Sequence, residues 1–209
     1  CMIWRNYFLQ YFFQEFRVHF IQKISVIAVF LVLSGFYAGA EELWRLRYFV
    51  PTSSESEITR GSSKGTDKLN TSGHGGNLVF ANGIGLGYST VRTNGNLGGI
   101  DYKFKNHSLD LSYTIGDTLS LTVGAGRLIY GRGELSMNGT SYVTESSSGE
   151  SLFMNFGIPF IGGELLMAYR QNNTEYQNYQ SKISGKSVML ADSVKLLSGQ
   201  ISAGLGFLF

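Results

Sequence analysis

Seven charged residues lie in short segments in which polar and apolar residues alternate. Each of the seven occupies a polar position of its segment. Side chains of both signs that share one buried face must pair with one another, since an unpaired charge away from water is costly. The set therefore predicts either a salt-bridged core or a path for ions, and we favour the closed core. The set consists of Arg45, Arg47, Asp101, Lys103, Asp110, Glu164 and Arg170.

Hydrolytic chemistry has one candidate constellation, in which His107 and Ser108 precede Asp110. A histidine that activates a serine must reach its hydroxyl, and an acid must orient the histidine. Adjacent residues on a strand point to opposite faces, however, so the His107 and Ser108 side chains should diverge. We expect no catalytic site here.

Other motifs lack the context that cofactor or metal binding requires. Gly83, Gly85 and Gly87 alternate along a predicted strand and open no helix, unlike a dinucleotide-binding loop. Gly185-Lys186-Ser187 resembles the end of a phosphate-binding loop, but Gln180 occupies the place of its first glycine. Only two histidines follow residue 40, and no cysteine does. We expect neither a cofactor nor a metal.

The composition narrows the class of protein. The chain has 209 residues, 43% hydrophobic and 14% aromatic, with a mean hydropathy of +0.01. A helical multi-span membrane protein would be far more apolar than this chain, and a disordered chain would be less apolar than it is. One cysteine excludes a disulfide framework, and a formal charge of +2 is too weak to indicate a nucleic-acid partner. We expect one domain after any leader is removed.

Residues 1–40 have the order of a secretory signal peptide. Three basic residues precede an uncharged 13-residue run over 24–36, and Ala38 and Ala40 then provide the small residues that signal peptidase recognises. The alternative is a transmembrane anchor, for which the run is short of the roughly 20 residues required. We predict cleavage after Ala40, which leaves residues 41–209 with 14 basic and 14 acidic groups. The three basic residues are Arg5, Arg17 and Lys23.

Beyond the leader, the dominant periodicity is two, which indicates β-strands. Short and long connections alternate between the strands, as in an up-and-down meander with both termini on the short-turn side. We expect short connections at 93–98, 116–117 and 161–163, a tight one at 106–107, and long ones at 52–77, 132–151 and 172–195. The eight predicted strands run over residues 44–50, 78–89, 100–104, 109–115, 119–126, 152–160, 165–170 and 197–209.

Three observations indicate that the apolar face of these strands points outward. The polar face is rich in glycine, which relieves crowding inside a narrow eight-stranded barrel. That face also carries the seven charges, which can pair nearly one for one. Aromatic residues, among them Trp44, Tyr88 and Phe160, lie toward strand ends, as in the girdles of membrane barrels. The sequence predicts an all-β, eight-stranded antiparallel transmembrane barrel over residues 41–209.

The C-terminus adds a resemblance. Residues 202–209, SAGLGFLF, are similar to the signal by which bacterial outer-membrane barrels are recognised by their assembly machinery, with Ser202, Gly204, Phe207 and Phe209 at its characteristic positions. With the eight-strand pattern, the chain resembles the OmpA, OmpX and opacity-protein superfamily. No periplasmic domain follows Phe209, so the OmpX or opacity-protein arrangement fits better.

The resemblance implies location in the bacterial outer membrane and a non-catalytic structural, surface-interaction or adhesion role. The expected partners are outer-membrane lipid and lipopolysaccharide, the barrel-assembly machinery, and an extracellular partner bound by the long loops. Arg127 should lie at the outer rim, near lipopolysaccharide phosphates. The alternatives are a small passive channel and an enzyme that modifies lipid A or phospholipid. A secreted lipocalin-like carrier is disfavoured by the terminal phenylalanine.

Overall fold

The computed structural model of the chain describes residues 44–61, 63–67, 69–116, 119–183, 186–190 and 193–209. The predicted leader, with Ala38 and Ala40, lies outside these residues. The described segments form twelve strands of one antiparallel sheet. Within those segments, no helix has the length and apolarity needed to cross a membrane.

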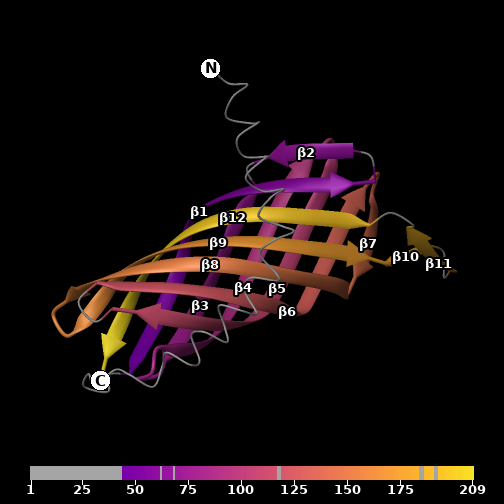
Figure 1. The fold of residues 1–209 in the computed structure, drawn as a ribbon. Helices are drawn as coiled ribbons and strands as arrows, with labels where there is room; N and C mark the ends of the chain where they lie inside the picture. The colour runs from indigo at the N-terminus through magenta and orange to yellow at the C-terminus, as the bar shows by residue number, and fades with distance from the viewer. Residues whose placement is uncertain (1–43, 62, 68, 117–118, 184–185, 191–192) are drawn as a thin grey trace. The chain divides into compact units, whose positions relative to one another are not determined.

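Eight strands close into a barrel (Figure 1). Each pairs with its neighbour in the sequence of barrel strands, and β1 and β12 pair along their whole length, from Arg45↔Leu208 to Arg60↔Val194. The predicted eight-stranded up-and-down barrel is therefore confirmed. The barrel strands are β1 (Arg45–Arg60), β3 (Asn70–Val79), β4 (Ile84–Leu97), β5 (Ile100–Ile115), β6 (Ser120–Met137), β8 (Ser146–Phe160), β9 (Gly163–Gln177) and β12 (Val194–Leu208).

The two ends of the barrel differ. The end that holds Trp44 and Phe209, here called the terminal end, has only short connections, around residues 80–83, 116–119 and 161–162. The opposite, distal end carries four further strands, of which β10 and β11 are seen in Figure 1 beyond the ends of β8 and β9. The further strands are β2 (Ser63–Asp67), β7 (Thr140–Thr144), β10 (Tyr179–Ile183) and β11 (Lys186–Leu190).

Much of what the sequence predicted as long loops is strand. β1, β6 and β9 continue distally to Arg60, Met137 and Gln177, where polar residues replace the apolar alternation that marks a lipid-facing strand. The predicted short connection at 93–98 is also wrong, because β4 continues to Leu97 and turns at the distal end.

The predicted strand at 78–89 is two strands joined by a tight turn. β3 ends at Val79, and the amide of Gly83 donates to the carbonyl of Phe80 before β4 begins. Gly83 has φ +82°, a left-handed conformation that glycine adopts without a steric cost. The turn is short enough that the apolar alternation continues through it, which concealed the break.

The opposite error affects β5. The sequence predicted separate strands at 100–104 and 109–115 with a turn at 106–107, but the backbone alternates without a break from Ile100 to Ile115. The only irregularity in its pairing with β6 is a register shift between His107 and Ser108. The two errors compensate each other, so the predicted count of eight strands was right for partly wrong reasons.

The polarity of β5 inverts halfway along its length, and this caused the error. Even-numbered residues face inward throughout, but Tyr102 and Phe104 are apolar whereas Ser108 and Asp110 are polar. Odd-numbered residues face outward, where Lys103 is polar and the residues from Leu109 onward are largely apolar. The apolar positions therefore change from even-numbered to odd-numbered residues along β5. The cause is a change in the surroundings of the strand, and the chain does not turn.

An apolar belt surrounds the terminal half of the barrel. Its side chains are exposed. Water would disfavour so large a continuous apolar surface, whereas the hydrocarbon core of a membrane requires one. The belt consists of Trp44, Leu46, Tyr48, Val50, Leu86, Tyr88, Leu109, Leu111, Ile115, Leu119, Leu121, Val123, Ile129, Tyr130, Met154, Phe156, Ile158, Phe160, Leu165, Met167, Tyr169, Ile201, Leu205, Phe207 and Phe209.

The continuity of β5 is testable by inserting a short peptide epitope. An insertion after Gly98 lies in a distal turn and should leave the barrel intact, whereas one after Asn106 interrupts β5 and should abolish folding. Folding is measured by the difference in gel mobility between unheated and boiled samples. A folded barrel with the insertion after Asn106 would show that the turn predicted from the sequence was right.

Candidate functional site in the barrel lumen

A buried ion-pair network occupies the lumen near the terminal end. Arg45 Nη1 lies 2.7 Å from Glu164 Oε1, and Arg47 Nε lies 2.8 Å from Glu164 Oε2. Arg47 and Glu164 are 1% and 4% exposed. β1 supplies both arginines at alternate positions, and β9, which is separated from β1 only by β12, brings the glutamate to them.

Two guanidinium groups share one carboxylate in this network, so neutral acceptors satisfy the remaining donors. Arg47 donates to the hydroxyls of Ser120 at 2.9 Å and Thr122 at 2.5 Å, and Arg45 donates to the carbonyl of Gly116 at 3.0 Å. Ser120 also donates to Glu164 at 2.9 Å. These contacts block the lumen at this level, because buried charges held by several partners do not move apart freely.

A second ion pair lies at the middle of the lumen. The Arg170 guanidinium holds both carboxylate oxygens of Asp110, with Nη2–Oδ2 at 2.5 Å and Nη1–Oδ1 at 3.1 Å. The guanidinium also donates to the Ser89 hydroxyl at 2.9 Å, and its central carbon, Cζ, lies 4.7 Å from the centre of the Phe153 ring. This bidentate, stacked geometry is one that arginine provides and lysine does not.

Close packing around the Asp110–Arg170 pair explains why β6 has a glycine at position 126. A Cβ added to Gly126 would lie 2.1 Å from Asp110 Oδ1 and 2.5 Å from the Ser151 hydroxyl. Any side chain at this position would displace the carboxylate from Arg170. The prediction that lumen glycines relieve crowding therefore holds at Gly126 in atomic detail.

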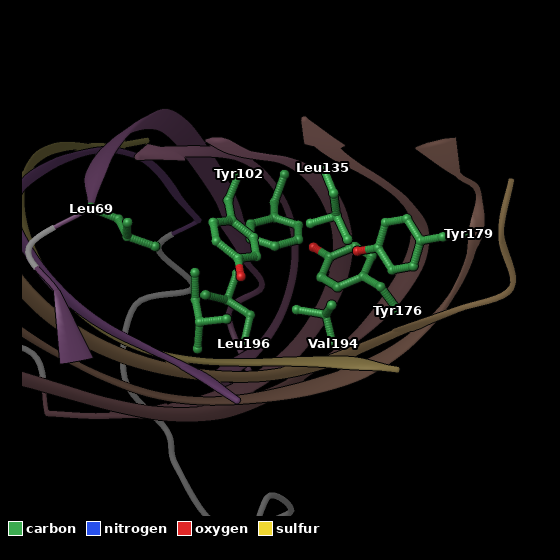
Figure 2. Close-up of a cluster of buried hydrophobic side chains, with 9 residues drawn as sticks. Leu69, Tyr102, Leu135, Tyr176, Tyr179, Val194 and Leu196 are labelled. Atoms are coloured by element: carbon green, nitrogen blue, oxygen red, sulfur yellow. The ribbon is translucent and has the colours of Figure 1, made fainter. Parts of the chain in front are cut away.

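Beyond the middle of the barrel, the distal half of the lumen is filled by apolar and aromatic side chains (Figure 2). Phe104 and Tyr176 stack with their ring centres 4.6 Å apart, and the Tyr176 hydroxyl donates to Asn106 at 2.6 Å. A tyrosine hydroxyl is already uncharged at neutral pH, and burial raises the pKa of the Tyr179 hydroxyl further. The distal cap consists of Ile58, Leu69, Tyr102, Phe104, Leu135, Tyr176, Tyr179, Val194 and Leu196.

Between the ion-pair network and the distal cap lies a cavity of about 50 Å³. Asp110 and Arg170 line it together with Asn77, Phe153 and Gln200. A cavity of this size, to which Asp110, Arg170 and Gln200 offer polar groups, suits a few water molecules and is too small for a solute. The described interior is thus closed on both sides of this cavity.

The structure brings five of the seven sequence-predicted charges into the lumen, in two groups: Arg45, Arg47 and Glu164, and Asp110 with Arg170. The predicted lumen positions of Asp101 and Lys103 are wrong, because both residues lie on the outer face of β5. Lys103 is 61% exposed and lies 3.9 Å from Glu134 on β6. The physical reason is the polarity inversion of β5, which places its distal apolar residues inside and its charges outside.

The hydroxyls that complete the lumen network were not predicted. Ser120, Thr122, Ser89 and Ser151 face inward at the levels of the two ion pairs. Each occupies the polar phase of its strand, so strand alternation was a usable signal for finding them.

The hydrolytic constellation is not assembled. His107 faces outward, where its Nδ1 contacts the Tyr88 hydroxyl, while Ser108 is buried and Asp110 is held by Arg170. Among the described residues, no group of three or more His, Cys, Asp or Glu is placed to hold a metal ion.

The residues of the predicted assembly signal lie on the last strand. Ser202 faces the lumen, Gly204 pairs with Phe49, and Phe207 and Phe209 are 58% and 63% exposed at the terminal end. The amide of Phe209 donates to the carbonyl of Trp44 at 3.1 Å, which completes the barrel at its rim.

No protein-family model matches the sequence, and neither does any curated protein. Among solved structures, Neisserial surface protein A is similar with a TM-score of 0.55 at 12% identity, over 79% of this chain and 97% of that one. The chain has the fold of a small outer-membrane β-barrel.

Two further solved structures resemble this barrel. The attachment invasion locus protein Ail of Yersinia pestis is 19% identical over 80% of this chain and all of its own, with a TM-score of 0.45. The outer membrane protein OprG of Pseudomonas aeruginosa is 15% identical over 79% of this chain and 96% of its own, with a TM-score of 0.48.

The ion-pair network yields a stability prediction. Glu164→Gln leaves two buried guanidinium groups without a carboxylate and should lower the free energy of unfolding by about 3–5 kcal/mol. The matched control is Glu134→Gln, which breaks the exposed pair with Lys103 and should cost less than about 1 kcal/mol. Urea unfolding in phospholipid vesicles, followed by Trp44 fluorescence, measures both values. Equal effects would contradict the structural role assigned to Glu164.

Proposed function

We propose that the chain is an integral protein of the bacterial outer membrane with a non-catalytic role at the cell surface. The observation that carries this proposal is the inverted polarity of the barrel, in which an apolar outer belt surrounds a lumen closed by ion pairs. A barrel that carried an apolar ligand through water would have the opposite arrangement.

The asymmetry of the two ends supports an orientation. Outer-membrane barrels have short periplasmic turns and longer extracellular connections. The terminal end here has only short turns, so it is assigned to the periplasm, and the distal end with β2, β7, β10 and β11 is assigned to the exterior. The leader predicted at 1–40 and the aromatic end of β12, with Phe207 and Phe209, fit export followed by recognition by the barrel-assembly machinery.

The distal strands supply the surface for interaction. They extend the sheet beyond the apolar belt, and the distal cap lies beneath them with Tyr176 and Tyr179. The fold is shared with Neisserial surface protein A, whose name places that protein at a cell surface. We assign structural support of the membrane to the barrel, and adhesion or another surface contact to the distal end.

The non-catalytic assignment rests on the lumen. Asp110 is engaged by Arg170, Glu164 is engaged by Arg45 and Arg47, and His107 faces away from Ser108. An enzyme that modifies lipid A or phospholipid needs an acid or base free to exchange a proton with its substrate. These groups are instead committed to structural pairs.

Surface labelling on intact cells tests the orientation. Ser141→Cys places a thiol at the exposed distal hairpin and should react with a membrane-impermeant maleimide. Ile161→Cys places one in the terminal-end turn, where Ile161 is 91% exposed, and should react only after lysis. The parent protein is the control for Cys1. Labelling of Ile161→Cys alone on intact cells would refute the orientation.

The alternative function, a small passive channel, is favoured only by the cavity at the middle of the lumen, which Asp110 and Arg170 line. Because the ion-pair network and the distal cap close the lumen on either side, the wild-type protein should show no steady conductance in planar bilayers. A conductance that changes in Arg47→Ala would replace the closed-barrel proposal with the channel.

A further inference from the structure

Three basic residues lie directly opposite one another on the outer face of three adjacent strands. Arg92 on β4 pairs in register with Lys105 on β5, and Lys105 pairs with Arg132 on β6. Strands in a sheet lie about 4.8 Å apart, so the row spans roughly 10 Å of the barrel wall. In the sequence these are isolated cations, and only the register of the sheet brings them together. The three residues are called the basic row below.

None of the three cations has a hydrogen-bond or ion-pair partner among the described residues. The acidic residues nearest in register are engaged elsewhere, because Glu134 pairs with Lys103 and Glu145 accepts a hydrogen bond from the Tyr130 hydroxyl at 3.3 Å. Like charges directly opposite each other destabilise a sheet. The basic row therefore carries a repulsion that no ion pair among the described residues relieves.

The basic row lies just beyond the apolar belt. His107 lies two residues closer to the terminal end than Lys105 on β5. Its ring centre is 5.5 Å from that of Tyr130, and its ring also contacts the hydroxyl of Tyr88. Tyrosines mark the boundary between hydrocarbon and lipid head groups. Two residues of strand span about 7 Å, so the cations lie at the level of the head groups of the distal leaflet.

Charge is unevenly distributed around this rim of the barrel. The β4–β6 side carries the basic row, whereas Arg127, nearer the belt, lies in register opposite Glu150 on β8. The rim elsewhere carries outward-facing acidic residues, and one of them, Glu175, lies 3.9 Å from Lys195. An anion at head-group level is thus attracted most strongly to the β4–β6 side, where three cations lie side by side without an ion-pair partner among the described residues. The acidic residues are Glu55 and Glu57 on β1, Glu150 on β8 and Glu175 on β9.

We propose that the basic row of Arg92, Lys105 and Arg132 is a binding site for the phosphoryl groups of lipopolysaccharide in the surrounding leaflet. Arginine and lysine form strong charge-assisted hydrogen bonds with phosphate, and a bound phosphate removes the repulsion within the row. The site rests on the proposed location in the outer membrane, with the distal half in the outer leaflet.

The test compares two double variants of the full-length protein, isolated from membranes in detergent. Arg92→Gln/Lys105→Gln removes two cations from the row, and Lys103→Gln/Lys195→Gln removes two that already pair with Glu134 and Glu175. The probe is purified lipopolysaccharide, used with its phosphates intact or enzymatically removed, and inorganic phosphate is a third arm. The readout is the temperature at which the heat-modifiable gel band of the folded barrel is lost.

Intact lipopolysaccharide should raise the unfolding temperature of the wild type and of the Lys103/Lys195 variant equally. The row variant should require at least about tenfold more lipid for the same rise, because it loses two charge-assisted contacts. Without lipid, the row variant should be at least as stable as the wild type, since repulsion is relieved. This last result separates a ligand site from a structural role and also shows that the variant folds.

Three results would overturn the proposal. An equal loss in both double variants would show a general charge effect. An unchanged response to dephosphorylated lipopolysaccharide would show that phosphate is not the recognised group. Full stabilisation by inorganic phosphate at the same phosphate concentration would assign the row to a free anion and not to the lipid. All three measurements are made in detergent, so their failure leaves the labelling test of orientation unaffected.

Discussion

The pairing of the first barrel strand with the last is the constraint on which the rest of the structure depends. A hydrocarbon environment offers no hydrogen-bond partner to a free strand edge, so every lipid-facing backbone group must be paired within the sheet. β1 and β12 satisfy this from Arg45 to Arg60, and the amide of Phe209 bonds the carbonyl of Trp44 at the rim. Closure then fixes which side chains share the narrow interior, and charges far apart in sequence are forced to meet there.

Closure also explains why the barrel has two different interiors. Where lipid surrounds the wall, the outward positions are apolar and the polar residues turn inward, so the terminal half of the lumen needs ion pairs such as Arg47–Glu164. Where the strands rise beyond the belt, the outward positions face water, and the interior becomes an ordinary apolar core around Phe104 and Tyr176. The two interiors together close the described lumen.

Sequence reasoning succeeded where a residue's neighbours along the strand predict its surroundings. The apolar outer face, the lumen positions of Arg45, Arg47 and Glu164, and the antiparallel barrel all follow from alternation. It failed at Asp101 and Lys103 because it assumed that one polarity holds along a whole strand. It also missed the turn at 80–83 and introduced one at 106–107, since a change of environment and a change of direction produce the same slip in the apolar pattern.

The amino-acid pattern by itself determined that this chain forms a barrel with apolar residues toward lipid, because a period of two with glycine and paired charges on one face has few other stable solutions. Only the tertiary structure decided the register between strands. Register depends on turns and on two irregular pairings, one between His107 and Ser108 and one between Pro51 and Ser53, which alternation does not encode. It therefore decided that Asp110 meets Arg170 across the lumen, and that Arg92, Lys105 and Arg132 stand side by side on the outer wall.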